Sequence, residues 1–168
     1  MDKIQIVLDT SAIISLGCTE KFHLIKKIFH LNSPMRVKIE LEEISKRKDE
    51  IGKVAKNILD SNFITFHELP SNLQNIKGEV EVGNLANELK TEAIVTDDIK
   101  SMRKLEKTTN TPIWFSSFII YLLCERQLIS HKEGWSAIEA MRTKRGWKEN
   151  LIIDYAKILW EKQKEILK

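Results

Sequence analysis

The feature that most constrains this chain is the spacing of its short apolar runs. The run IQIVL at residues 4–8 is rich in β-branched residues and only five residues long, as expected for a buried strand. Similar runs recur at 63–66 and 93–96, and the segments between them have helical composition. Strands that alternate with helices pair in parallel, and the helices cover both faces of the sheet. We therefore expect an α/β fold with a central parallel sheet of about four to five short strands.

The remaining elements follow from apolar periodicity and from chain-breaking residues. Two further short runs, at 35–39 and 113–115, are interpreted as strands, and LNSP at 31–34 as a break. Apolar residues at helical spacing predict helices over residues 12–16, 21–29, 40–47, 51–60, 78–90, 99–107 and 117–126.

The pattern changes near residue 126. Ser130 and Glu133 have the spacing of a capping box, which opens a helix, and Gly146 then marks a break. Residues 147–168 again carry apolar residues at helical spacing, with lysines opposite. We expect a domain over residues 1–126 and a helical C-terminal extension over 127–168 that packs on the same domain.

Composition limits the class of protein. The chain has 168 residues and a net charge of +3, which permits nucleic-acid binding without requiring it. No apolar run approaches the roughly 18 to 20 residues that cross a bilayer, and MDKIQIVLDT lacks a signal-peptide pattern. We expect a cytoplasmic protein that does not enter a membrane. Cys18 and Cys124 lie far apart in sequence and are expected to be free thiols.

Acidic residues follow two of the predicted strands. Asp9 comes directly after the first strand, and Asp97 and Asp98 come after the strand at 93–96. The carboxyl ends of parallel strands meet at one edge of the sheet, where functional groups collect. Helix starts supply further candidates, namely Glu40, Glu42, Glu43, Glu79 and Glu81. Taken singly, each acid is also explained by helix capping or by a solvated face.

Several carboxylates at one edge favour a particular chemistry. Like charges brought together are unfavourable unless a cation neutralises them. Oxygen ligands with room for water suit Mg²⁺ or Mn²⁺. Such an ion activates water and stabilises charge on a phosphoryl oxygen, so phosphodiester hydrolysis is the expected reaction class.

Two stretches resemble a known family. The string IVLDTSA at residues 6–12 is similar to the opening motif of PIN domains, the fold of VapC-type toxins and related ribonucleases. The stretch GEVEVGNLANELKTEAIVTDDIKSMRKL at 78–105 resembles the second half of that fold, with its acidic helix start and Thr-x-Asp strand end. The helix between them carries an acid before an aliphatic residue, Glu43-Ile44. The resemblance covers roughly residues 4–126.

The resemblance implies a set of site residues. The metal-binding and catalytic acids are Asp9, Glu43, Glu79 and Asp98, with Glu40 and Glu42 left open as alternatives to Glu43. The residues implied to support them are Thr10, Ser11, Thr96 and Asp97, and those implied to meet RNA phosphates are Lys100, Arg103 and Lys104. A further polar group often follows the last strand in this family, and here that place holds Ser116 and Ser117.

The resemblance also implies an activity. It is Mg²⁺- or Mn²⁺-dependent endoribonuclease cleavage, with the toxin of a toxin–antitoxin pair as one role the family offers. An antitoxin partner and a homodimer belong to that expectation. Two hypotheses compete with it. One is an inactive PIN-like module that binds RNA or protein. The other is a phospho-acceptor or hydrolase α/β domain with Asp9 as nucleophile. A start of the haloacid-dehalogenase type would need a second Asp where Ser11 stands.

Overall fold

The computed structural model describes residues 3–74, 78–148 and 150–166, with side chains described as far as residue 162. Its centre is one sheet of five parallel strands in the order β3-β2-β1-β4-β5. The strands are β1 (Ile4–Leu8), β2 (Phe29–Pro34), β3 (Ile64–His67), β4 (Ala93–Val95) and β5 (Ile113–Trp114). The expected α/β fold with a parallel sheet is confirmed.

The central strand β1 marks the place where the chain reverses direction across the sheet. Ile6 of β1 is in register with Leu31 of β2 on one side and with Ala93 of β4 on the other. The chain first builds β2 and β3 on one side of β1, and then crosses back to place β4 and β5 on the other. The gap between β1 and β4 is therefore a topological switch point, where open α/β sheets bind ligands.

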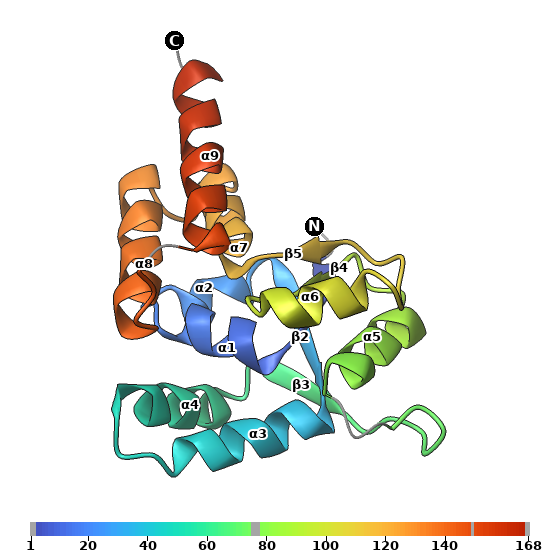
Figure 1. Ribbon diagram of the computed structural model, residues 1–168. Helices are drawn as coiled ribbons and strands as arrows, with labels where there is room; N and C mark the ends of the chain where they lie inside the picture. The colour runs from blue at the N-terminus through green and yellow to red at the C-terminus, as the bar shows by residue number, and fades with distance from the viewer. Residues whose placement is uncertain (1–2, 75–77, 149, 167–168) are drawn as a thin grey trace.

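Nine helices are found among the described residues. Before the third strand lie α1 (Thr10–Gly17), α2 (Phe22–Ile25), α3 (Met35–Ser45) and α4 (Glu50–Ser61). The others are α5 (Gly78–Leu89), α6 (Ile99–Leu105), α7 (Ser116–Glu125), α8 (His131–Lys144) and α9 (Leu151–Ile166). Helices α1, α3 and α4 contact one another, whereas α5 contacts α6 and the central strands. Connections between parallel strands are right-handed. The reversal at β1 therefore places α5 and α6 on the face of the sheet opposite α1, α3 and α4 (Figure 1).

Residues 21–34 differ from the prediction. The helix expected over 21–29 ends at Ile25, and the expected break at 31–34 is part of β2. Phe29 does not continue a helical face but enters the sheet opposite Ile4. The polar residues are tolerated because they are paired: Asn32 Nδ2 donates to Gln5 Oε1 at 2.9 Å, and Ser33 Oγ donates to the Leu8 carbonyl at 2.8 Å.

The strand expected over 35–39 is also wrong, because α3 begins at Met35. Pro34 occupies the N-cap with extended backbone, so the helix starts directly after the strand. Val37 and Leu41 are four residues apart and both buried, so the apolar period is helical.

Helices α8 and α9 continue from α7. Both contact α7, and residues of both lie in the same buried core as the strands. In Figure 1 the three helices stand together at one side, and α9 projects away from the sheet. Gly146, with φ of +66°, separates α8 from α9 as expected, because glycine adopts this backbone region without strain.

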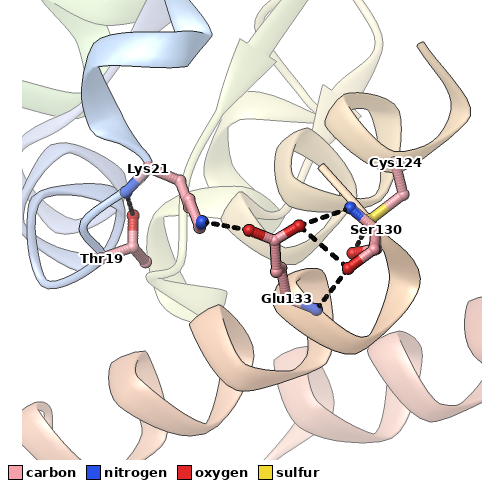
Figure 2. A network of polar contacts seen from close by, with 5 residues as sticks. All are labelled: Thr19, Lys21, Cys124, Ser130 and Glu133. Atoms are coloured by element: carbon pink, nitrogen blue, oxygen red, sulfur yellow. Dashed lines mark hydrogen bonds and ion pairs between the residues drawn. The ribbon is translucent and has the colours of Figure 1, made fainter. Parts of the chain in front are cut away.

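A polar network joins the start of α8 to the N-terminal half of the chain. The predicted capping box is present, with Ser130 at the N-cap and Glu133 accepting from its backbone N–H. Glu133 also accepts from Lys21 Nζ at 2.8 Å, as Figure 2 shows. The hydrogen bonds from Lys21 and Ser130 lower the pKa of Glu133 to about 2.

The two cysteines are free and buried, as predicted. Cys124 Sγ lies 3.7 Å from the Ser130 carbonyl, within the network of Figure 2. Burial raises the pKa of Cys124 to about 11, so its thiol is protonated at neutral pH. Within the described residues, no helix is both long and apolar enough to cross a membrane.

Candidate active site

Asp9 follows β1 and Asp98 follows β4, and both line one pocket. It has a volume of about 230 Å³ and lies at the carboxyl edge of the sheet, among the starts of four helices. Its lining residues are Asp9, Thr10, Ser11, Val37, Glu40, Gly78, Glu79, Val82, Asp98, Ser101 and Leu105. Four carboxylates from four separate segments therefore face one hollow.

Asp9 is held rigidly. Its side chain caps α1 by accepting from Ala12 N at 2.8 Å, and it accepts from Ser11 Oγ at 2.7 Å. Thr96 Oγ1, from the end of β4, donates to the second carboxylate oxygen. Burial raises the pKa of Asp9 to about 6, although these hydrogen bonds act to lower it. The carboxylate is thus fixed in orientation, and no Lys, Arg or His of the described residues forms an ion pair with it.

Asp97 and Asp98 have different surroundings. Asp98 points to the pocket and caps α6, where Ser101 Oγ donates to it at 2.9 Å. Burial acts to raise the pKa of Asp98, but the hydrogen bonds from Ser101 and from Lys100 N outweigh it, and the pKa is lowered. Asp97 is buried and accepts from Ser116 N at 2.9 Å and Ser116 Oγ at 2.6 Å. Asp97 therefore joins β4 to α7 and does not face the pocket.

Glu40 and Glu79 are the other two acids that line the pocket. Glu40 accepts a hydrogen bond from Thr10, which follows Asp9 in the chain, and lies 3.5 Å from Arg36 Nε. Glu79, at the start of α5, pairs with Lys104 of α6 at 2.6 Å. A side chain at Gly78 would crowd the pocket, since a Cβ there would lie 3.2 Å from Glu40 Oε1.

The structure does not bring Glu43 to this pocket. Glu43 is exposed one turn further along α3, where it pairs with Lys46. Glu42 is also exposed, and its nearest cation is Lys38. Of the three glutamates that the sequence left open, only Glu40 lines the pocket with Asp9.

The predicted RNA-contacting residues lie on α6. Lys104 is paired with Glu79, and Lys100 and Arg103 are exposed. Sequence reasoning missed Arg36, whose Nε is buried without a hydrogen bond beside Glu40. A signal for it exists: a helix that starts at Met35 places positions 36 and 40 on one face.

A divalent ion of the Mg²⁺ type fits the donor chemistry of this pocket, which offers four carboxylates and several hydroxyl groups. As the described side chains stand, no three His, Cys, Asp or Glu residues converge in a metal-binding arrangement. Each carboxylate instead contacts a donor of the chain itself, such as Lys104 or Ser101. Binding an ion would require Glu40 and Glu79 to turn from these donors towards Asp9 and Asp98.

The parallel sheet and the acid-lined pocket at its switch point define an α/β protein with a nuclease-like fold. A model of the DUF3368 family, described as a PIN domain, matches residues 5–161. The chain therefore belongs to the PIN-domain family. PIN domains are generally nucleases and typically use divalent metal ions. No curated protein matches this chain significantly.

Proposed function

We propose that this protein is a Mg²⁺- or Mn²⁺-dependent endoribonuclease whose active site is formed by Asp9, Glu40, Glu79 and Asp98. The observation that carries the proposal is their shared pocket at the switch point of the sheet, in a PIN-domain chain. Acids that are distant in sequence lie together only because β1 and β4 are neighbours.

The four acids have separate roles in this proposal. Asp9 and Asp98 would hold the principal ion, because they follow adjacent strands and the hydroxyl groups of Ser11, Thr96 and Ser101 fix their orientation. The ion would activate a water molecule and stabilise charge on the phosphoryl oxygens. Glu79 helps to orient the attacking water.

Glu40 takes the place that the sequence gave to Glu43. Its support is the hydrogen bond from Thr10, the residue that follows Asp9, and its place in the pocket that Asp9 lines. Arg36 Nε lies 3.5 Å from Glu40 Oε1, beside the pocket, and would offer positive charge to a scissile phosphate.

The substrate in this proposal is RNA, and its flanking phosphates would meet the exposed Lys100 and Arg103 near Asp98. The toxin role, the antitoxin partner, the homodimer and the cytoplasmic location stay predictions. They rest on the sequence and on its family resemblance.

The test is cleavage of a mixed RNA pool. Wild type is expected to cut RNA with Mn²⁺ and to stop when EDTA is added, and Asp9→Asn is expected to be inactive with Mn²⁺. Equal cleavage by wild type and Asp9→Asn would refute the proposal. RNA binding without any cleavage by wild type would favour the inactive binding module.

A further inference from the structure

A second pocket lies on the helical extension, apart from the acidic one. It has a volume of about 430 Å³, and its walls come from α8 and α9. The lining residues are His131, Lys132, Trp135, Lys157, Trp160 and Glu161. Three aromatic rings, two lysines and one glutamate thus surround a hollow that has room for a small planar group.

The ring of Trp160 is fixed in place. Its Nε1 donates to the His131 carbonyl at 3.1 Å, and its centroid lies 5.8 Å from that of Trp135 and 5.6 Å from that of Tyr121. Since the polar atom of the indole is already bonded inward, the ring can offer an incoming group only its carbon surface.

Gly134 explains how this indole approaches α8 so closely. A Cβ at residue 134 would lie 2.9 Å from Trp160 Cζ2 and 2.4 Å from Cys124 Sγ. Glycine inside a helix is less favourable than alanine. Its presence here is explained by the space it leaves, which lets Trp160 pack against α8 as a rigid wall of the pocket.

Lysines stand beside these rings. Lys132 and Lys157 are exposed, and Lys157 Nζ is 3.2 Å from Asp154 in a solvated pair that a phosphate can replace. An aromatic face with flanking cations matches a nucleotide, since a base stacks on one ring and its phosphates meet the ammonium groups.

We propose that this pocket is a second RNA-binding site, which stacks one unpaired base on Trp135, with Trp160 held edge-to-face beside it at an interplanar angle of 63°, while Lys132 and Lys157 contact the neighbouring phosphates. The proposal rests on the proposed function only in taking RNA as the ligand. Because the pocket offers ring surface and point charges, the preference it predicts is for single-stranded RNA over duplex, with little discrimination among bases.

The experiment measures binding without cleavage. The full chain carries Asp9→Asn, EDTA is present, and the probe is a fluorescein-labelled oligoadenylate of about 12 nucleotides, followed by anisotropy. One variant is Trp135→Leu, with Trp147→Leu as its control outside the pocket. A second is the double variant Lys132→Glu and Lys157→Glu, with Lys53→Glu and Lys56→Glu on α4 as its charge-matched control.

We expect Trp135→Leu to weaken binding about tenfold, the loss typical of one stacked base. The double variant on α8 and α9 should weaken it by a similar factor, and both controls should bind within about twofold of the parent. Circular dichroism and light scattering establish that the variants are folded and report their oligomeric state. The double variant changes only exposed side chains, so it tests the site even if Trp135→Leu fails to fold.

Unchanged affinity in the double variant would overturn the proposal. So would a change of oligomeric state with unchanged RNA affinity, since the pocket would then be covered by a second copy of the chain. If wild type does not cleave the RNA pool but RNA binding still depends on this pocket, the proposed catalytic function is refuted and the proposed binding site is supported.

Discussion

At the scale of single residues, the position of Glu40 decides the composition of the acidic site. Glu40 and Glu43 are three residues apart on α3, but only Glu40 contacts Thr10 beside Asp9. The reason is the point at which α3 begins. The helix starts directly after Pro34, so Val37 is buried and Glu40 reaches Thr10, whereas Glu43 pairs with Lys46 in solvent.

Replacing each of these two glutamates by glutamine, one at a time, gives a matched pair of variants. We expect Glu40→Gln to lower the rate of RNA cleavage by about tenfold or more. Residues that only support a metal ligand typically cause losses of about tenfold to 100-fold when they are replaced. Glu43→Gln removes an exposed ion pair and should retain cleavage within about twofold. Single-turnover rates at saturating Mn²⁺ measure both. A larger loss of cleavage in Glu43→Gln than in Glu40→Gln would show that Glu43 is the site glutamate.

Some of the candidate site residues could be predicted from sequence and others could not. Asp9 and Asp98 follow buried strands, and the ends of parallel strands meet whatever the helices do. A glutamate on a helix has no such constraint, because a shift of one residue in the helix start turns it by about 100°. Without the bounds of α3, the sequence left three glutamates open.

At the scale of elements, the prediction was wrong over residues 21–39. The five strands alternate with helices as the sequence indicates, but β2 contains Asn32 and Ser33, which were interpreted as a break. Local patterns could not reveal this strand, because its polar side chains are satisfied by partners far along the chain. His67 of β3 and Gln5 of β1 both contact Asn32.

The capping box of α8 gives a prediction on pH. The pKa of Glu133, about 2, is depressed below its ordinary value of 4.5 by Lys21 and Ser130. Glu133 therefore stabilises the fold above about pH 4.5, and this contribution is lost as the pH falls through about 2. The other charged groups at this junction are Glu20 and Lys144.

Urea unfolding of wild type and Glu133→Gln between pH 6 and pH 3 measures the effect. The difference in free energy of unfolding between the two proteins should shrink as the pH falls. A difference that stays constant for Glu133→Gln would contradict the assignment.

At the scale of the whole molecule, the helical extension and the sheet share one core. Ile138 of α8 and Ala156 of α9 are fully buried in the same cluster as the strands, and the family match runs to residue 161. The sequence predicted a domain ending at residue 126 with the extension packed upon it. We propose that residues 1–126 depend on that packing.

A chain shortened to residues 1–126 tests this dependence. It loses the helices that cover α7, whose Ile120 and Leu123 are fully buried. Each exposed side chain of this kind costs about 1.5–3 kcal/mol, against a total stability of about 5–15 kcal/mol. We expect no cooperative thermal transition by circular dichroism. A sharp transition close to that of the full chain would show that residues 1–126 fold independently.

The central claim is that acids spread from residue 9 to residue 98 form one site for a divalent ion. Calorimetric titration of Mn²⁺ into the protein without RNA tests it most directly, because it depends on neither substrate nor turnover. Wild type and Glu43→Gln should bind Mn²⁺ alike, while Asp9→Asn and Asp98→Asn should each bind at least about tenfold more weakly. Equal Mn²⁺ affinity in all four proteins, or none in wild type, would contradict the claim.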